Sequence, residues 1–430
     1  MNIQQEAHQM KLVSPLMANT SNELRNQALT AIRKALVDHQ TEIFAANQLD
    51  LSRAKEDGIS DAVYKRLKFD DGKLSAVTEG IDQLISLADP IGRVRLHRML
   101  DDDLEMKQIT CPIGVIGVIF EARPDALIQI STLCIKSGNC AILKGGKETR
   151  ETNRVLFSLI AQAAVAAGLP DGCLLQVTQH NEIDELLSCD KDVDLLIPRG
   201  SNAFVQYIMN NTKIPVMGHA DGICHIYVDA AADFAKALPI LVDAKTQYTA
   251  ACNAVETILV HRSIAPDFLP KLADAFQAAN VRIRGTKEVF DLLPGSYPQE
   301  DIMQEEDFHT EYLDLIASVK IVDSVEEAVD HINRFGSHHT DAILTEDDAA
   351  ANYFLSMVDS AGVYRNISTR FADGFRYGFG AEVGISTSKL HARGPVGLEG
   401  LVTYKYQICG DGNIVADYAQ GRRNFHFRDL

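Results

Sequence analysis

Residues 112–149 read PIGVIGVIFEARPDALIQISTLCIKSGNCAILKGGKET, and this stretch decides the fold. Val115–Phe120 is a short apolar run with β-branched residues, which predicts a buried strand. Pro124 suits the first turn of a following helix, and Gly138 suits its end. Cys140–Leu143 predicts the next strand. This strand–helix–strand order is typical of a parallel sheet with crossover helices and indicates an α/β fold.

The same alternation continues along the chain. Further strands are predicted at residues 174–177, 193–197, 224–229, 255–260, 316–322, 341–344 and 362–364. The two series of strands, before and after about residue 245, predict two parallel-sheet α/β domains, which we place at 1–97 with 113–244 and at 245–395. Residues 98–112 and 396–430 fit neither series and predict a small ribbon that adds an edge to a sheet or to another subunit.

The N-terminal part is predicted to be helical to about residue 87. Thr20 and Glu23 have capping-box spacing, which predicts a helix start at Thr20. Leu29, Ile32 and Leu36 then recur at helical spacing.

Composition limits the class of protein. A chain of 430 residues is too long for one compact core, and its 46% hydrophobic and 23% charged residues are ordinary for a globular protein. No apolar run reaches the roughly 18 residues of a membrane span, and the first 24 residues lack the basic start and apolar stretch of a signal peptide. We therefore expect a cytoplasmic protein. The net charge of −18 disfavours nucleic acid and anionic membranes as partners.

The eight cysteines are scattered, and no C-x-x-C pair is present. This pattern is typical neither of a disulfide framework nor of a zinc site, so no metal is expected. Cys252, within TQYTAACNAVETILV (246–260), lies among small and polar residues just before an apolar strand. Such a turn can give a nucleophilic sulfur access and backbone N–H donors, but Cys252 can equally be a buried core cysteine.

LKGGKE, residues 143–148, places Gly145 and Gly146 between a strand and a helix. Glycines let the backbone approach a ligand, and Lys144, Lys147 and the helix start all favour an anion such as a nucleotide phosphate. The alternative is an ordinary βα turn with solvated lysines. Neither G-x-x-x-x-G-K-[ST] nor a G-x-G-x-x-G after a strand occurs, so a nicotinamide cofactor must bind in another way.

Three further segments carry candidate residues. Arg123 closes a predicted strand, where ligands of open parallel sheets bind, but it can also form a structural ion pair. His391 and Arg393 stand in a loop dense in glycine and cations, or simply face solvent. Glu311 precedes a predicted strand and suits either a ribose hydroxyl or a helix cap.

Together these segments resemble one family, the glutamate-5-semialdehyde dehydrogenases, also called gamma-glutamyl phosphate reductases, of the aldehyde dehydrogenase superfamily. The matching stretches, spread over about residues 112–412, are the opening quotation, TKIPVMGHADGICHIYVD, AACNAVETILV, HTEYLDLIASVKIV and ISTSKLHARGPVGLEGLVTYKY. The resemblance implies the aldehyde dehydrogenase fold. It makes 1–97 with 113–244 the NADP-binding domain, 245–395 the catalytic domain, and 98–112 with 396–430 an oligomerisation ribbon.

Roles carry over by position. The resemblance implies that Cys252 is the nucleophile, that Lys144 approaches the adenosine ribose and phosphate, and that Glu311 holds the nicotinamide ribose. Gly200-Ser201 matches a turn near the pyrophosphate. Lys147 stands where NAD-dependent members have a ribose-binding glutamate, and a cation there favours NADP over NAD.

Two departures from the superfamily concern chemistry. The glutamate that activates water in hydrolytic members aligns with Met217, which suits a reductase that must protect its thioester from water. The side-chain amide usually offered to the oxyanion aligns with Ala122. The oxyanion would then depend on the Cys252 backbone N–H and another donor, for which Asn253 is the candidate.

The implied reaction is the second step of proline biosynthesis from glutamate. Cys252 attacks L-glutamyl 5-phosphate, phosphate leaves a thioester, and NADPH reduces it to L-glutamate 5-semialdehyde. Arg123, His391 and Arg393 are candidates for binding the phosphate or the α-carboxylate. A homo-oligomer and a complex with glutamate 5-kinase are expected partners. The alternatives are a related NADP-dependent reductase of another acyl phosphate or acyl thioester, and a catalytically silent oligomer.

Overall fold

The computed structural model describes residues 2–178, 182–218, 221–293, 301–380 and 382–430. By its contacts the chain divides into two units. The first comprises Met1–Met217, Phe379–Gly384 and Val396–Leu430, and the second comprises Gly218–Gly378 and Ile385–Pro395. Each unit is described by itself.

The first unit contains a parallel sheet of four strands within the described residues, in the order β5-β4-β3-β6. Their bounds are β3 Val115–Phe120, β4 Cys140–Lys144, β5 Leu174–Val177 and β6 Leu195–Arg199. All residues of β3 and β4 are buried, as the continuous apolar runs predict for a sheet covered on both faces. The strands' carboxyl ends therefore meet at one edge, where β3 leads into Glu121, β4 into Gly145 and β6 into Gly200.

Helices cover this sheet and follow its strands. They are α1 Ile3–Ala18, α2 Asn22–Asp38, α3 Gln40–Glu56, α4 Asp61–Leu67, α5 Asp71–Ser86, α6 Pro124–Lys136, α7 Arg150–Ala166, α8 Glu182–Leu187 and α9 Asn202–Asn210, with the short 3₁₀ helix η1 Lys147–Thr149 before α7. The predicted start of α2 was wrong by one residue. Ser21 is its N-cap and accepts a hydrogen bond from the Leu24 amide at 3.1 Å, whereas the Thr20 hydroxyl donates to Met17 O.

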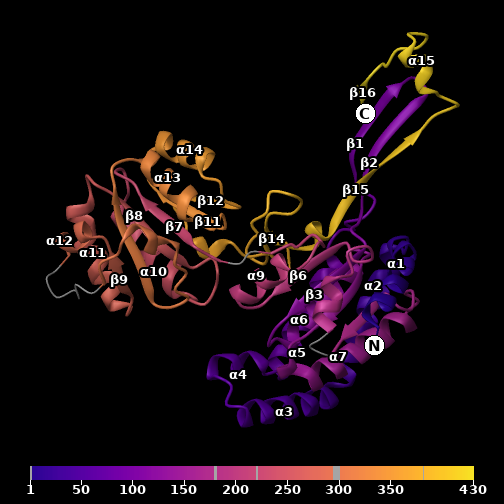
Figure 1. The fold of residues 1–430 in the computed structure, drawn as a ribbon, viewed down its shortest axis with the longest axis horizontal. Coiled ribbons are helices and arrows are strands. Elements are labelled where there is room, and N and C mark those ends of the chain that lie inside the picture. Colours follow the sequence, from indigo (N-terminus) through magenta and orange to yellow (C-terminus); the bar gives the residue numbers. More distant parts are fainter. Residues whose placement is uncertain (1, 179–181, 219–220, 294–300, 381) are drawn as a thin grey trace. The chain divides into compact units, whose positions relative to one another are not determined.

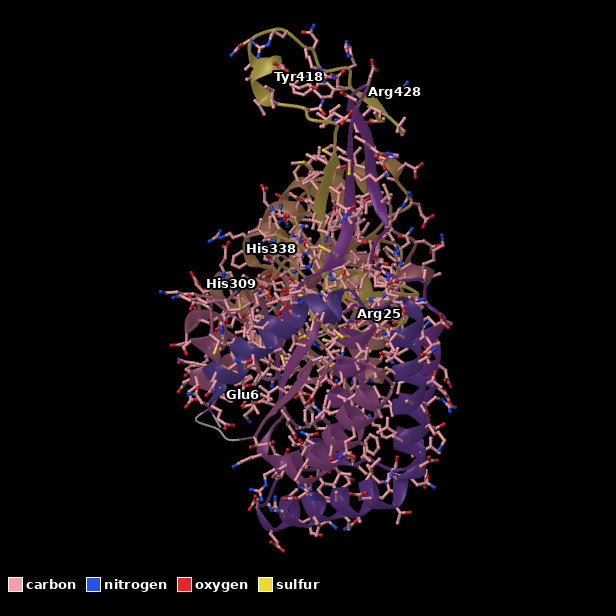
Figure 2. All side chains as sticks on the ribbon, turned by 90° about the vertical axis from the view of Figure 1, so that its right-hand side faces the viewer. Glu6, Arg25, His309, His338, Tyr418 and Arg428 are labelled. Atoms are coloured by element: carbon pink, nitrogen blue, oxygen red, sulfur yellow. The ribbon has the colours of Figure 1, made fainter. Side chains whose placement is uncertain are left out.

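The first unit also contains an antiparallel sheet (Figure 1). Among the described residues its order is β15-β2-β1-β16, with β1 Val94–Asp101, β2 Leu104–Pro112, β15 Val402–Cys409 and β16 Arg428–Asp429. The short helix α15 Val415–Ala419 follows β15. Figure 2 labels Tyr418 and Arg428 at the far end of this ribbon. The two extended segments predicted from sequence do pair, since β15 runs along β2 from Val402↔Pro112 to Cys409↔Glu105.

The second unit is built on a larger parallel sheet. Among the described residues its order is β12-β11-β7-β8-β10-β9, with β7 Cys224–Val228, β8 Val255–His261, β9 Arg282–Gly285, β10 Ile316–Val322, β11 Thr340–Leu344 and β12 Gly362–Arg365. The helices are α10 Phe234–Thr246, α11 Ala265–Ala278, α12 Lys287–Leu292, α13 Val325–Phe335 and α14 Asp348–Met357, with the 3₁₀ helices η3 Glu305–His309 and η4 Thr369–Phe371. The short strands β13 Gly384–Ser386 and β14 Gly394–Val396 and the 3₁₀ helix η5 Leu398–Leu401 lie near the points where the chain passes between units.

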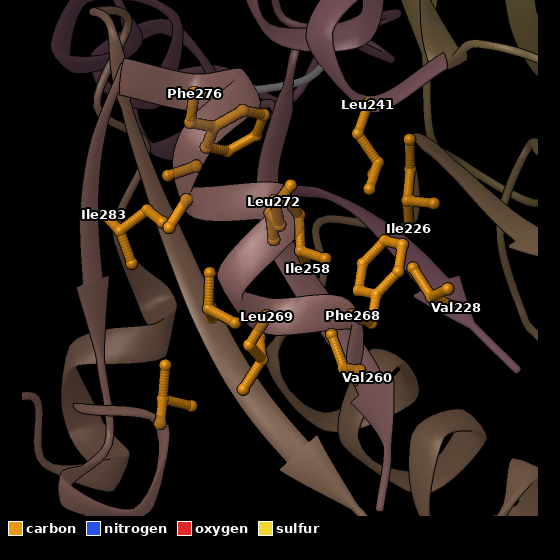
Figure 3. Packing of buried hydrophobic residues seen from close by; sticks show 14 of the residues in the cluster. Ile226, Val228, Leu241, Ile258, Val260, Phe268, Leu269, Leu272, Phe276 and Ile283 are labelled. Atoms are coloured by element: carbon orange, nitrogen blue, oxygen red, sulfur yellow. The ribbon is translucent and has the colours of Figure 1, made fainter. Parts of the chain in front are cut away.

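Alternate residues of the strands point into two hydrophobic cores, one on each face of the sheet. Ile226, Val228 and Ile258 pack with helix α11, whose Phe268, Leu272 and other apolar residues lie against the sheet (Figure 3). The intervening residues Tyr227 and Leu259 face the opposite side, where α13 and α14 pack. This period of two is the geometry of a strand buried on both faces. Because β11, β7 and β8 are parallel neighbours in the sheet, the segments that precede them lie next to one another.

The predicted α/β class, with two parallel sheets and a small antiparallel sheet, is confirmed. Strand β9 was not predicted, and the predicted strand 193–197 lies at 195–199. The chain's contacts divide it at Gly218, so that β7 joins the second sheet, whereas our functional boundary was placed after residue 244. Among the described residues, no helix has both the length and the apolar character that spanning a bilayer requires.

Candidate active site

Cys252 lies on a tight turn between α10 and β8. The Ala251 amide donates to Tyr248 O at 3.4 Å, and the Ala254 amide donates to Ala251 O at 2.9 Å, so the chain turns on both sides of the cysteine. The small residues Ala250, Ala251 and Ala254 allow this packing. The turn leaves Cys252 partly exposed at the amino end of β8, which gives its sulfur the access that a nucleophile needs.

Most of the other cysteines are in a different environment. Five are buried, and burial raises the pKa of each of their thiols; they are Cys134, Cys140, Cys173, Cys189 and Cys224. The pKa rises to about 12 for Cys134 and to about 11 for Cys173. A protonated, buried thiol is a poor nucleophile because the thiolate is the reactive form. The structure therefore separates Cys252 from these five by exposure.

Gly222 packs directly against the backbone of Cys252. A Cβ added at Gly222 would lie 2.1 Å from Cys252 O and 2.4 Å from its Cα, distances that no side chain can occupy. Two residues later, the Cys224 thiol donates to Cys252 O at 3.2 Å. The segment before β7 therefore fixes the backbone that carries the sulfur, and residue 222 must be glycine for this close approach.

Two basic side chains lie near the sulfur. Cys252 Sγ is 3.2 Å from Nε2 of His339, which is 1% exposed and directly precedes β11. Arg370, in η4, is also buried, and burial lowers the pKa of its guanidinium, while interaction with the Cys252 sulfur acts in the opposite direction. Arg370 Nε donates to Gln247 Oε1 at 2.9 Å. The imidazole of His339 thus contacts the sulfur, and the guanidinium of Arg370 interacts with the sulfur electrostatically.

A fully buried ion pair lies behind the turn. Lys245 Nζ donates to Glu256 Oε2 at 2.7 Å, and both side chains are 0% exposed. Burial raises the pKa of Glu256 to about 7, and Lys245 opposes that rise. Glu256 Oε1 also accepts from the Leu313 amide at 3.4 Å, and Leu313 has a φ of 54°. The pair thereby ties the segment after Glu311 to the strand that follows Cys252.

Asn253, the predicted oxyanion donor, is buried beside Cys252. Its Nδ2 donates to Ala372 O at 2.8 Å, and its Oδ1 is buried without a hydrogen-bond partner. One of its two amide N–H groups is therefore committed to the backbone near η4. Its role as an oxyanion donor stays a prediction.

The predicted phosphate loop lies at the carboxyl end of β4. Lys144 is buried, its Nζ donates to Gly145 O at 2.7 Å, and burial lowers the pKa of its ammonium. Lys147 is exposed at the start of η1. The amino end of α7 already holds an anion, because the buried Asp50 accepts from the Thr152 amide at 2.8 Å.

A cavity of about 330 Å³ lies beside this loop, and residues of the N-terminal helix α3 form part of its lining. Its lining combines cations, acids and two apolar side chains, namely Arg53, Lys147, Arg150, Asp50, Asp57, Glu148, Ala54 and Ile59. Nothing in the sequence pattern linked α3 to this loop, because the two are about 100 residues apart and meet only through packing.

At the end of β6 the predicted pyrophosphate turn meets Glu121. The Ser201 amide donates to Glu121 Oε2 at 3.1 Å, and a Cβ added at Gly200 would lie 2.5 Å from the same oxygen. A carboxylate of the chain thus occupies the amino end of α9 in this structure. Arg123 is exposed, at the N-cap position of α6.

Among the remaining candidates, Arg393 Nη2 donates to the backbone and side-chain oxygens of Asp359, each at 3.1 Å. Its neighbour His391 has a φ of 66° and is exposed. Met217, which the resemblance aligns with the water-activating glutamate of hydrolytic members, is buried in the first unit, and its amide donates to Leu196 O at 2.8 Å. His219 and Ala220 of the same stretch lie outside the described residues.

The structure brings Cys252 and Asn253 together with residues that had no predicted role, namely Gly222, His339 and Arg370. Gly222 and His339 each stand just before a predicted strand, as Cys252 does. This shared position before a strand was the sequence feature that could have linked the three residues. It shows that they are neighbours only if the order of the strands in the sheet is known, and the sequence does not supply that order. The cofactor candidates Lys144 to Ser201 belong to the first unit, whereas Cys252 and Glu311 belong to the second.

Comparison with known proteins shows the family to which the chain belongs. The model of the aldehyde dehydrogenase family matches residues 2–290. A gamma-glutamyl phosphate reductase of Pelotomaculum thermopropionicum is 54% identical over 430 residues, covering 100% of this chain and 98% of the relative. The crystal structure of a gamma-glutamyl phosphate reductase from Thermotoga maritima superposes with a TM-score of 0.93 at 35% identity, covering 96% of this chain and 100% of that one.

A more distant structure shares the fold alone. An engineered glycolyl-CoA reductase with bound NADP+ is 15% identical with a TM-score of 0.63, and the alignment covers 95% of this chain and 96% of that one. The full-length match at 54% identity shows the family, whereas the match at 15% identity shows only the fold. The chain belongs to the gamma-glutamyl phosphate reductases, within the aldehyde dehydrogenase family of oxidoreductases, which use nicotinamide cofactors.

Proposed function

We propose that this chain reduces L-glutamyl 5-phosphate to L-glutamate 5-semialdehyde and phosphate, using NADPH and a thioester on Cys252, in the second step of proline biosynthesis from glutamate. The observation that carries the proposal is the Cys252 turn, where a partly exposed sulfur lies beside His339 and a buried arginine. Relatives that match the whole chain are named for this reaction.

The chain's residues account for acyl transfer. The Cys252 sulfur attacks the acyl carbon, an S–C bond forms, and the C–O bond to phosphate breaks. Arg370 supports this step because a buried cation near the sulfur opposes the negative charge of an acyl phosphate. We propose the Cys252 backbone N–H and Asn253 as oxyanion donors. When bound, the nicotinamide cofactor supplies the hydride that reduces the acyl carbon.

The site must also exclude hydrolysis. The position of the water-activating carboxylate holds Met217, a buried side chain that cannot accept a proton from water. This supports a thioester that persists until it is reduced.

For the cofactor we propose NADP. The candidate residues for its phosphates and adenosine are Lys144, Gly145, Gly146, Lys147, Gly200 and Ser201, and Glu311 stays the candidate for the nicotinamide ribose. Lys147 is exposed beside a cavity that also contains Arg53 and Arg150. The same lining contains Asp50, Asp57 and Glu148, so the proposal depends on the exposed Lys147 as the cation that meets the 2′-phosphate. Release of the Ser201 amide from Glu121 would be required before that amide could bind a pyrophosphate oxygen.

Substrate and protein partners complete the proposal. Arg123, His391 and Arg393 stay candidates for the α-carboxylate or phosphate, and Arg370 is added to them. Arg393 would first have to leave Asp359. The exposed apolar residues of the antiparallel ribbon, including Tyr404, Tyr406 and Ile408, support its use in a homo-oligomer. A complex with glutamate 5-kinase and a cytoplasmic location belong to the same proposal.

The test couples the protein to glutamate 5-kinase, glutamate, ATP and NADPH. We expect NADPH consumption that stops when the kinase is left out. Without cofactor, peptide mass spectrometry should find the glutamyl adduct on Cys252. The proposal fails if no NADPH is consumed, or if the adduct lies on another cysteine. Consumption with a different acyl phosphate or acyl thioester, and none with glutamyl phosphate, would assign a related reductase instead.

A further inference from the structure

The imidazole of His339 is held between the Cys252 sulfur and a threonine. Nε2 lies 3.2 Å from Cys252 Sγ, and Nδ1 lies 2.9 Å from the Thr340 Oγ1. The ring is 1% exposed, so it cannot turn into solvent. Both ring nitrogens therefore have fixed partners, and one of them is the reacting atom of the proposed mechanism.

The backbone and the next strand hold this ring in place. The amides of Ala361 and Gly362 donate to His338 O and His339 O at 2.9 and 3.0 Å, which pins the segment at the start of β11. Thr340 is 1% exposed, and its side chain interacts with the Tyr364 hydroxyl on β12, where it opposes the rise in pKa that burial causes. A chain of contacts thus runs from sulfur to imidazole, threonine and tyrosine.

Charged and titratable groups surround this pair on each packed element. Arg370 approaches from η4, the Cys224 thiol from β7 and the Tyr364 hydroxyl from β12. Asp341, next on β11, is committed to His225 and Ser360. His339 is placed to exchange a proton with the sulfur directly, because its Nε2 lies 3.2 Å from Cys252 Sγ.

We propose that His339 is a catalytic residue that accepts the Cys252 proton and returns it to the departing phosphate, a role that rests on the proposed function. The S–H bond breaks and its proton passes to Nε2, while the sulfur electron pair forms the S–C bond. As the C–O bond breaks, the proton moves from Nε2 to the phosphate oxygen. The tautomer required has Nδ1–H donating to Thr340 Oγ1, so Thr340 is a positioning residue.

His339→Asn tests the role without a large change in volume. General acid–base catalysis contributes about 100- to 10,000-fold, so kcat/KM should fall by that factor. The rate of iodoacetamide alkylation, followed at each cysteine by peptide mass spectrometry, should fall at least about 10-fold at neutral pH for Cys252, since a free thiol is only a few per cent ionised there. Its pH profile should become that of an ordinary cysteine, with a pKa of about 8.5.

His338→Asn is the matched control. This neighbouring imidazole contacts Asp359 O at 2.6 Å and has a φ of 60°, which asparagine tolerates. We expect its Cys252 pH profile to equal that of the unaltered protein. An H339N profile that equals the H338N profile overturns the proposal.

A second variant tests the same role if H339N does not fold. Thr340→Val keeps the imidazole and removes its hydroxyl partner. We expect a shift of the Cys252 alkylation profile towards that of a free thiol, and an unshifted profile overturns the proposal. The two proposals fail separately. Unlabelled Cys252 in the glutamyl-trapping experiment ends the proposed function, whereas a labelled Cys252 that ignores both substitutions ends only the role of His339.

Discussion

The two parallel sheets carry their candidate residues at opposite edges. In the first unit, Lys144 ends β4, and Glu121 and Gly200 follow β3 and β6, at the carboxyl ends of strands where ligands of open α/β sheets usually bind. In the second unit, Gly222, Cys252 and His339 precede the amino ends of β7, β8 and β11. The same architecture therefore presents two chemically different edges.

Helix orientation explains what each edge must supply. Strands of the first sheet run into helix amino ends, which favour anions, and Asp50 and Glu121 provide carboxylates at two of them. The amino edge of the second sheet follows the carboxyl ends of helices such as α10 and α13, which offer no positive dipole. An anion there needs side-chain cations, and Arg370 with His339 can provide them. The following predictions test this contrast, from the largest expected effect to the smallest.

Cys252→Ser should abolish catalysis, because it removes the proposed nucleophile at the amino edge of the second sheet. Loss of a nucleophile can cost on the order of a million-fold in rate, so NADPH oxidation in the coupled assay should become undetectable. Cys409→Ser, at the exposed cysteine of the ribbon, is the control and should keep full activity. Retention of activity by C252S would remove the proposed role of that edge.

Glu256→Gln should lower the free energy of unfolding, because it breaks the buried ion pair behind the Cys252 turn. At a pH above about 7, where Glu256 is ionised, the substitution leaves the buried Lys245 without its carboxylate, which costs about 3–5 kcal/mol of unfolding free energy. Glu346→Gln, at the exposed Lys236 pair, should cost less than about 1 kcal/mol. Urea unfolding of both variants measures the difference, and equal values would show that the buried pair is not supporting this edge.

The Glu256 pair also predicts a pH dependence. Burial raises the pKa of Glu256 from 4.5 to about 7, so the folded protein retains a proton that the unfolded chain loses in this interval. The linked stabilisation is complete below pH 4.5 and is lost as the pH rises through about 7. Unfolding free energies measured across this range should show that decline in the unaltered protein and not in E256Q. Parallel curves for the two proteins would contradict it.

Gly222→Ala should displace the sulfur. Its Cβ would lie 2.1 Å from Cys252 O, and a misplacement of about 1 Å can cost about 100-fold in kcat/KM. The control is Gly80→Ala in α5, where an added Cβ meets nothing within 4 Å and should stabilise the helix by up to about 1 kcal/mol. If steady-state rates of the two variants are the same, the close packing against Cys252 does not matter for catalysis.

Lys147→Glu should affect the first edge alone. Loss of one charge-assisted contact, worth about 1.5–3 kcal/mol, should lower the ratio of kcat/KM for NADPH to that for NADH by about 10- to 100-fold. Lys34→Glu, on the exposed face of α2, should leave the ratio unchanged. If K147E leaves the ratio of kcat/KM unaltered, Lys147 does not bind the 2′-phosphate of NADPH.

The sequence went furthest where a local pattern and a local structure coincide. Val115–Phe120, Pro124 and Cys140–Leu143 predicted β3, α6 and β4 correctly because strand and helix periodicity is set by neighbours in the chain. The start of α2 was misplaced by one residue, since Thr20 and Ser21 can both cap and packing selects between them. The resemblance selected Cys252, and the family it implied is confirmed by the relatives.

The sequence by itself therefore determined the α/β class, the family and the position of the candidate sulfur. Only the tertiary structure decided what surrounds that sulfur. Gly222 and His339, from segments 30 and 87 residues away in sequence, meet Cys252 because β7, β8 and β11 lie side by side in the sheet order β11-β7-β8. Strand order depends on packing of whole elements, and no local pattern encodes it.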